Sequence, residues 1–322
     1  MIYKSMRGNK VSAICYGGSS ISKPEHISNL QCAIDNGVNF IDTSENYNNG
    51  NSEIIIGQAI NKNRENIFLG TKVGPENLKY DDVINSCKMS LNRLQTNYID
   101  LYYVHWPNSS IPIKETCSAL LELKENLKLI KNIGFCNFNI QQLEEAYNIL
   151  GDKILTIQSE YNLFERSVEN DVMPFCLKHG IFFVAFSPLK WMKYSKYMDY
   201  DHSFILSWII SHQNVIVATS SLNNNHIEKS CNSKIIEIKE IEKVNTSSID
   251  INLIEYDINK KASDIMDVLG EDVKRYGALK PIKVIKENNK YKIIDGTMRF
   301  LVWKYVYPDK PIEAIILKNN NE

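Results

Sequence analysis

Residues 67–104 read IFLGTKVGPENLKYDDVINSCKMSLNRLQTNYIDLYYV, and this stretch decides the fold class. It opens on the apolar run Ile67–Thr71, continues through the amphipathic stretch Asp81–Leu94 and closes on a second apolar run, Ile99–Val104. Nearly continuous apolar runs are typical of parallel strands that are covered on both faces. The stretch therefore predicts one strand–helix–strand unit of an α/β fold.

The same alternation extends through residues 1–232. Further strands are expected at Val11–Tyr16, Val38–Asp42, Ile130–Phe135, Ile154–Ser159, Ile181–Phe186 and Val215–Thr219. Further helices are expected at His26–Asn36, Ser52–Asn61, Ile113–Leu127, Gln141–Leu150, Glu169–His179, Ser203–Ser211 and Asn224–Ser230. Gly37, Gly134 and Gly180 are expected between elements, as turn residues with positive φ. Eight such units predict a (β/α)8 TIM barrel. A doubly wound open sheet is the weaker alternative, because the first turn is not rich in glycine.

The order of elements changes near Ser233. Residues 233–245 are charged and weakly periodic, which predicts a linker or a peripheral element. In residues 246–322, strands are expected at Ile249–Leu253, Ile282–Lys286, Tyr291–Ile294 and Ile312–Leu317, and helices at Ser263–Tyr276 and Met298–Val306. The polar turn Glu287–Lys290 between two apolar runs indicates a hairpin. A small α+β domain is therefore expected after the barrel.

Composition excludes several classes of protein. The 322 residues include 37 basic and 38 acidic side chains, a balance unlike that of a general nucleic-acid binder. Hydrophobic residues make up 43% of the chain, enough to bury a full core. No apolar stretch approaches the ~18 residues of a membrane span, and the N-terminus lacks the apolar run of a secretion signal. Seven cysteines without a Cys-x-x-Cys pair predict reduced thiols in a cytoplasmic protein and no zinc site.

Four polar side chains stand where three expected strands end, or just beyond. Asp42 ends the second strand and Tyr47 follows on its loop, while Lys72 and His105 follow the next two strands. Each has an ordinary explanation when taken alone, such as a cap, a solvated lysine or a structural histidine. Because strand ends meet at one mouth of such a barrel, we expect the four to converge. Lys72 would then lower the pKa of the Tyr47 phenol from about 10, and His105 would orient a carbonyl oxygen. Such a set suits carbonyl reduction by hydride from a cofactor.

Three stretches resemble the aldo/keto reductase superfamily, and the resemblance covers residues 1–232. They are Phe40-Ile41-Asp42-Thr43…Tyr47, Gly70-Thr71-Lys72 and Val104-His105-Trp106-Pro107, which match the motifs of the family's Asp–Tyr–Lys–His tetrad. The start, Met1–Ser12, looks like the hairpin that these proteins place across the bottom of the barrel. The resemblance implies that Tyr47 is the general acid, Lys72 the modulator of its pKa, Asp42 the partner of Lys72 and His105 the carbonyl-orienting group.

The resemblance also implies a cofactor, NADP or NAD. Its contacts would be Asn137 at the nicotinamide carboxamide, Gln158 on the sixth strand, Phe186 as the stacking aromatic, Ser187 and Leu189 on the pyrophosphate path, and Thr219, Ser220 and His226 near the eighth strand. Members that prefer NADP usually carry Lys or Arg where this chain has Thr219 and His226. The choice between the two cofactors therefore stays open.

The C-terminal stretch Tyr276-Gly277-Ala278-Leu279-Lys280-Pro281-Ile282, followed by Asp295-Gly296-Thr297-Met298-Arg299, resembles the ParB/sulfiredoxin superfamily. The resemblance implies a nucleotide or phosphate at Gly296, Thr297 and Arg299. Physically, Gly296 would allow close approach and Arg299 would add a bidentate charge at a helix start. A plain turn with an exposed Arg299 is the alternative. Residues 246–322 contain no Cys and no helix-turn-helix follows them, so neither sulfiredoxin chemistry nor DNA partitioning is expected.

Together these features predict a cytoplasmic, NAD(P)H-dependent reductase of a small carbonyl metabolite, fused to a nucleotide- or phosphate-binding module. A cofactor-binding regulator or redox sensor without turnover is one alternative. A bifunctional reductase and small-molecule kinase is another. No membrane or nucleic-acid partner is expected, and the sequence leaves the oligomeric state open.

Overall fold

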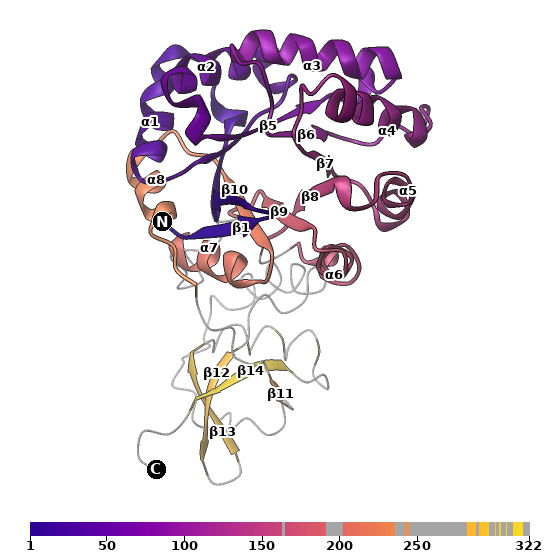
Figure 1. Cartoon of the computed structure of the whole chain (residues 1–322). Coiled ribbons are helices and arrows are strands. Elements are labelled where there is room, and N and C mark those ends of the chain that lie inside the picture. The colour runs from indigo at the N-terminus through magenta and orange to yellow at the C-terminus, as the bar shows by residue number, and fades with distance from the viewer. Residues whose placement is uncertain are drawn as a thin grey trace. The chain divides into compact units, whose positions relative to one another are not determined.

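The computed structural model describes residues 1–162, 165–190, 202–235, 242–244, 282–287, 290–295, 300, 303, 307 and 312–317 (Figure 1). The chain divides into two compact units, Met1–Asn162 with Arg166–Ile236 and Leu163–Glu165 with Glu237–Glu322. Each unit has a β-sheet of its own.

The first unit contains a closed barrel of eight parallel strands. In chain order they are β3 (Ile14–Gly17), β4 (Phe40–Asp42), β5 (Phe68–Val73), β6 (Leu101–Val104), β7 (Ile133–Cys136), β8 (Ile154–Glu160), β9 (Phe182–Phe186) and β10 (Val215–Thr219). Each strand pairs with the next one along the chain, and β10 pairs with β3 to close the ring. The predicted (β/α)8 barrel is therefore confirmed, and the open doubly wound sheet is excluded.

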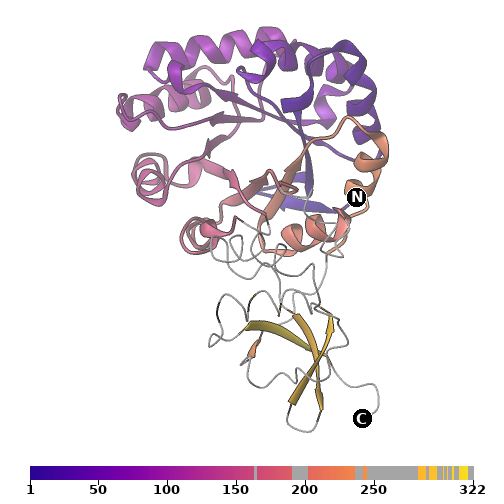
Figure 2. The ribbon, with the colours of Figure 1, turned by 180° about the vertical axis from the view of Figure 1, so that it is seen from behind.

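Helices surround the barrel on its outside (Figure 2). They are α1 (Ile27–Asp35), α2 (Asn51–Ile60), α3 (Tyr80–Leu94), α4 (Ile113–Leu121), α5 (Ile140–Leu150), α6 (Val172–Lys178), α7 (His202–Ser211) and α8 (Asn224–Cys231). Short 3-10 turns lie at Gly18–Ser20, Pro24–His26, Tyr47–Gly50, Asn61–Asn66, Pro75–Asn77, Gly151–Lys153 and Ser167–Glu169. The expected helix Ile113–Leu127 is instead α4 followed by a π-helical turn, Glu122–Asn126.

A hairpin closes the N-terminal end of the barrel. Strands β1 (Tyr3–Met6) and β2 (Asn9–Ser12) pair antiparallel, which agrees with the expected bottom hairpin. The single strand expected at Val11–Tyr16 is wrong, because Ala13 separates β2 from β3. Buried side chains of the hairpin pack with residues that begin several barrel strands, in a cluster that includes Met6, Val11, Phe40, Phe68, Leu101 and Phe182. The opposite, C-terminal end is thus the end available to a site.

Gly134 has a different role from the one expected of it. Gly37 and Gly180 have φ values of 90° and 61°, as turn glycines do. Gly134 instead lies inside β7, paired with Tyr103 on one side and Thr156 on the other. A Cβ at Gly134 would lie 2.5 Å from Tyr103 Cδ1 and 2.7 Å from Thr156 Oγ1. Glycine is required here because neighbouring strands place side chains against its backbone.

The second unit has a four-stranded sheet in the order β11 (Glu242–Val244), β14 (Ile312–Leu317), β12 (Ile282–Glu287) and β13 (Lys290–Asp295). Strands β12 and β13 form the hairpin predicted from the polar turn between them.

The linker expected at 233–245 is not a linker over its whole length, because residues 242–244 near its C-terminal end pair antiparallel with β14. The expected strand Ile249–Leu253 and helix Ser263–Tyr276 lie outside the described residues, as does most of Met298–Val306. So do Gly296, Thr297 and Arg299.

Among the helices of the described part of the chain, none is both long and apolar enough to span a membrane. All seven cysteines fall within that part, and each is a free thiol.

Candidate active site

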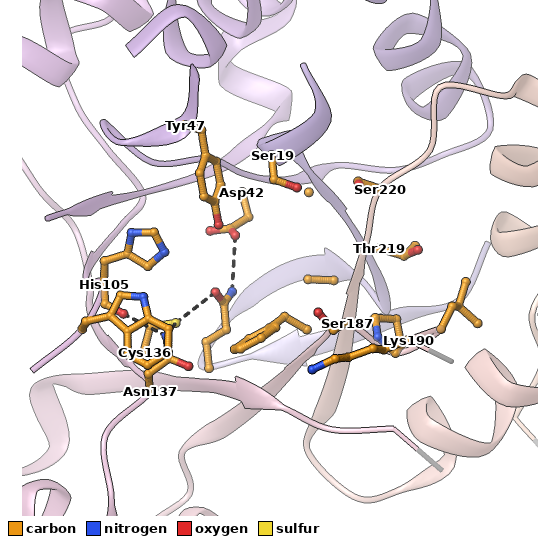
Figure 3. Close-up of a pocket in the computed structure, with 17 residues that line it drawn as sticks. Ser19, Asp42, Tyr47, His105, Cys136, Asn137, Ser187, Lys190, Thr219 and Ser220 are labelled. Carbon is orange, nitrogen blue, oxygen red and sulfur yellow. Dashed lines mark hydrogen bonds between the residues drawn. The ribbon is translucent and has the colours of Figure 1, made fainter. Parts of the chain in front are cut away.

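A cavity of about 490 Å³ opens where the barrel strands end (Figure 3). Residues that the sequence predicted for the site line it: Asp42, Tyr47, His105, Asn137, Gln158, Phe186, Ser187, Leu189, Thr219 and Ser220. Lys72 lies directly behind this wall. A volume of this size is typical of sites for small ligands and cofactors.

Lys72 and Asp42 form a buried ion pair at the base of the cavity. Lys72 Nζ donates to Asp42 Oδ2 at 2.5 Å and to the carbonyl oxygen of Thr43 at 2.7 Å. Their side chains are 0% and 5% exposed. Burial opposes the charge on Lys72, but Asp42 more than offsets it and raises the pKa of the ammonium. Lys72 therefore carries a fixed positive charge, as expected.

The Tyr47 hydroxyl faces this pair. Tyr47 Oη lies 3.5 Å from Lys72 Nζ, and the ammonium lies 5.0 Å from the centre of the phenol ring. Burial raises the pKa of Tyr47, while Lys72 acts to lower it. The net shift is upward, so the expectation that Lys72 brings the pKa of this phenol below 10 is wrong for the protein alone. Burial outweighs the nearby charge, and Tyr47 stays protonated at neutral pH.

Asparagines hold the loop that carries Tyr47. Asn48 and Asn49 have φ values of 51° and 56°, a left-handed conformation that asparagine tolerates better than most residues. The Asn48 amide donates to the carbonyl oxygens of Ser19 and Ile21, at 3.1 and 2.8 Å. The Asn-rich segment thus anchors the Tyr47 loop on the loop that follows β3.

His105 stands beside Tyr47, with the two rings nearly perpendicular and their centroids 5.5 Å apart. Burial and the charge of Lys72 lower the pKa of His105 to about 3. The imidazole is therefore neutral at ordinary pH. A neutral imidazole that carries its proton on the nitrogen facing the cavity can donate a hydrogen bond to a carbonyl oxygen.

Two amide side chains continue the cavity wall. Asn137 has a φ of 64°, and its amide donates to the His105 carbonyl oxygen at 3.0 Å. Gln158 donates to Asp42 Oδ2 at 3.4 Å and accepts from the Cys136 thiol at 3.4 Å. Burial raises the pKa of Cys136 to about 12, so this thiol is not ionised at neutral pH. The amides link the cavity wall to both Asp42 and His105.

The cavity also has residues that the sequence did not predict: Gly17, Ser19, Trp106, Cys136, Pro188, Lys190 and Ala218. Trp106 lies within a motif already quoted and Pro188 lies between the predicted Ser187 and Leu189. Cys136, Lys190 and Ala218 each adjoin a predicted residue in the sequence. Ser19 gave no such signal, since it comes after the first strand, where no motif was assigned. Its hydroxyl lies 3.0 Å from that of Ser220, though the two residues are far apart in the chain.

His226 is the one predicted barrel residue that the structure places elsewhere. It is exposed in the first turn of α8, where its ring lies 5.5 Å from that of His202, and it does not line the cavity. Thr219 and Ser220 line the cavity, on the side opposite His105 (Figure 3). Within the described residues, no three His, Cys, Asp or Glu side chains group together as metal ligands would.

The remaining groups fit a nicotinamide dinucleotide. The amides of Asn137 and Gln158 offer the hydrogen bonds that a carboxamide needs, and Phe186 offers a ring face. Ser19, Ser187 and Ser220 carry hydroxyl groups, which can donate hydrogen bonds to phosphate oxygens.

Fold and site define a barrel oxidoreductase that uses a nicotinamide cofactor. Residues 13–204 match the aldo/keto reductase family. Methylglyoxal reductase YeaE of Escherichia coli K12 is 30% identical over 239 residues, which span 69% of this chain and 83% of that protein. The sequence of Tm1743, a thermostable aldo-keto reductase with a crystal structure in complex with the inhibitor epalrestat, is 32% identical to that of this chain. The two structures are similar with a TM-score of 0.69. The match covers 74% of this chain and 96% of that one.

An aldo/keto reductase of Klebsiella pneumoniae in complex with NADP and acetate shares the fold, at 24% identity and a TM-score of 0.67. That likeness covers 84% of this chain and 94% of the other. The chain belongs to the aldo/keto reductase family. It is an NAD(P)H-dependent oxidoreductase.

Proposed function

We propose that this chain reduces the carbonyl group of a small aldehyde or ketone, and that 2-oxoaldehydes of the methylglyoxal type are among its substrates. One observation carries the proposal: a buried Asp42–Lys72 pair lies under the hydroxyl of Tyr47, beside a neutral His105, at one cavity. A relative at 30% identity is named for methylglyoxal reduction, which supports the choice of substrate class.

In this proposal the bound cofactor supplies hydride to the carbonyl carbon. Tyr47 gives its proton to the carbonyl oxygen, where negative charge develops. Lys72, 3.5 Å away, stabilises the phenolate that remains, and Asp42 keeps Lys72 charged and in place. His105 donates a hydrogen bond to the same oxygen and aligns it with Tyr47. The reaction consumes one proton, which Tyr47 recovers from solvent after product leaves.

The roles proposed for the cofactor contacts are those that the family resemblance implies, and the residues that would fill them all line the cavity. Asn137 and Gln158 would hold the carboxamide, Phe186 would cover the nicotinamide ring, and Ser187 and Leu189 would line the pyrophosphate path. Thr219 and Ser220 would meet the far part of the cofactor. We leave His226 out of this set, because it lies away from the cavity.

Loss of NADPH or NADH absorbance in the presence of methylglyoxal and other small aldehydes and ketones tests the proposal. We expect turnover with at least one 2-oxoaldehyde. Fluorescence titration with each cofactor, run in parallel, shows whether the site is intact and which cofactor binds more tightly. Tight cofactor binding without turnover across the panel would contradict the proposal and favour a regulatory, cofactor-sensing protein.

For the C-terminal region we propose a ParB/sulfiredoxin-like domain, residues 246–322, that binds a nucleotide or phosphate at Gly296, Thr297 and Arg299. The support is the sequence pattern of that turn, together with the mixed sheet of β12, β13 and β14 on either side of it in the chain. A thermal-shift panel of nucleotides with the full chain and with Arg299→Ala tests it. The absence of any shift in the unsubstituted chain would contradict it.

A cytoplasmic location is part of the same proposal. Six of the seven free thiols are buried in the barrel unit, and reduced thiols are typical of that compartment. Fractionation of the native cell, followed with an antibody to the chain, tests this assignment.

A further inference from the structure

Ser44 is a buried residue whose hydroxyl contacts His105 of the cavity wall, and the Asp–Tyr–Lys–His set does not include it. It lies two residues after Asp42 and is 0% exposed. Its Oγ lies 3.1 Å from Nδ1 of His105, a residue 61 positions further along the chain. The contact joins the loop after β4 to the loop after β6. Because this contact is to Nδ1, the other ring nitrogen of His105, Nε2, makes no contact with Ser44.

The other partners of Ser44 favour one direction for this hydrogen bond. The backbone N–H of Asn46 donates to Ser44 Oγ at 3.3 Å, which uses one of its lone pairs. The hydroxyl proton then has two acceptors, His105 Nδ1 at 3.1 Å and the Lys72 carbonyl oxygen at 3.5 Å. That carbonyl already accepts from the backbone N–H of Glu45, at 3.3 Å. The shorter of the two contacts is the one to His105, and Nδ1 has no other hydrogen-bond partner among the described residues.

A neutral histidine carries one proton on either of two nitrogens, and the hydrogen bond at one nitrogen sets which form is present. With the pKa of His105 at about 3, owing to burial and Lys72, the second proton is absent at ordinary pH. The tautomer therefore decides what the ring offers the cavity. A proton on Nε2 makes the ring a hydrogen-bond donor to a carbonyl oxygen, whereas a proton on Nδ1 makes Nε2 a lone pair that repels it.

We propose that Ser44 is a positioning residue for carbonyl reduction: its hydroxyl donates to His105 Nδ1 and so keeps the His105 proton on Nε2, facing the substrate. This rests on the proposed reductase function. Ser44 touches neither substrate nor cofactor in this account and acts only through the imidazole. The backbone of His105 is held separately, by its N–H to the Val73 carbonyl oxygen at 3.0 Å and by Asn137 at its own carbonyl. Ser44 therefore governs the ring and not the position of the chain.

The direct test is the 15N NMR spectrum of the histidine rings in the full-length protein, because each ring nitrogen shifts according to whether it bears the proton. The chain has six histidines, and comparison with His105→Asn identifies the signals of His105. We expect the Nε2–H tautomer in the unsubstituted protein. We expect a mixture of tautomers in Ser44→Ala, and an intermediate result in Ser44→Cys, since a thiol is a weak donor of similar size. An Nδ1–H tautomer in the unsubstituted protein would overturn the inference.

Kinetics give a second readout. In Ser44→Ala we expect kcat to fall about tenfold, as the loss of one hydrogen bond of ordinary strength predicts, while NADPH binding is unchanged. Ser90→Ala is the matched control, because Ser90 is also 0% exposed but bonds Arg93 on α3, away from the cavity. Equal kcat values for Ser44→Ala and Ser90→Ala would overturn the inference. Absence of turnover in the unsubstituted chain would instead contradict the reductase function, and the NMR result would still decide the tautomer.

Discussion

Nζ of Lys72 lies 2.5 Å from Oδ2 of Asp42 inside the barrel, where neither side chain is more than 5% exposed. The two residues are thirty positions apart, at the ends of the neighbouring strands β4 and β5. A charge pair with almost no access to water is costly to build and more costly to break on one side. Because the folded barrel holds the pair together at the base of the cavity, Lys72 stays charged there.

The first prediction concerns this pair. Asp42→Asn or Lys72→Met leaves one buried charge without its partner, and each is expected to lower the free energy of unfolding by about 3–5 kcal/mol. The double variant Asp42→Asn/Lys72→Met removes both charges and should lose clearly less than the sum of the single losses. Calorimetric unfolding of the four proteins completes the cycle. Additive losses would show that the two groups are independent.

The second prediction concerns pH. Reduction needs Tyr47 protonated and His105 neutral. Burial raises the pKa of Tyr47 above its usual 10, and burial with Lys72 lowers the pKa of His105 to about 3. The rate of the chemical step should therefore stay level between about pH 5 and pH 9, apart from general effects on the protein. Single-turnover rates under saturating cofactor measure it. A decline centred near neutral pH would assign another group, or a different pKa, to the proton transfer.

The third prediction concerns the effect of His105 on how the free energy of unfolding depends on pH. Its pKa in the folded state lies below the unfolded value of about 6.5, so the unfolded chain binds the extra proton first. The stabilisation from neutral His105 is complete above about pH 6.5 and is lost as pH falls toward 3. His105→Asn should flatten the acid side of the stability curve by up to about 1.4 kcal/mol per pH unit. His226→Asn, at an exposed histidine, is the control, and an identical curve for both variants would contradict the shift.

The fourth prediction concerns Gly134 in β7. Gly134→Ala places a Cβ 2.5 Å from the ring of Tyr103, so we expect a loss of about 1–3 kcal/mol in unfolding free energy from overpacking. Gly17→Ala is the matched control, because a Cβ there meets its nearest neighbour at an ordinary 3.6 Å and the φ of −81° suits alanine. Thermal unfolding of both variants measures the difference. Equal unfolding temperatures for the two variants would mean that the neighbouring side chains move to accept the Cβ at Gly134 without loss of stability.

Much of the barrel was predictable from the sequence because its strands are short apolar runs that alternate with amphipathic helices. The strand Val215–Thr219 was predicted with the bounds that the structure has. The error at Val11–Tyr16 arose because the end of β2 and the start of β3 adjoin in the sequence, with only Ala13 between them. Gly134 was misread because glycine fits both a turn and a crowded strand, and the difference depends on side chains of neighbouring strands.

The tetrad was predictable because its four members lie within three motifs, each at or just after a strand end. Ser44 lies within one of these motifs, yet its contact with His105 joins two loops, and no local pattern encodes it. The direction of the Tyr47 pKa shift was misjudged because the sequence shows a nearby lysine but not how deeply the phenol is buried. His226 was placed by analogy with relatives, and the first turn of α8 presents it to solvent instead.

Tyr47 is the residue that we propose as the proton donor in carbonyl reduction. The most direct test compares Tyr47→Phe with the unsubstituted chain in two measurements, NADPH binding by fluorescence and turnover of a 2-oxoaldehyde such as methylglyoxal. Phenylalanine keeps the ring but has no hydroxyl, so we expect cofactor affinity within about twofold and kcat reduced by at least about a hundredfold. A Tyr47→Phe protein that binds NADPH and turns over substrate at the full rate would show that Tyr47 is not the proton donor.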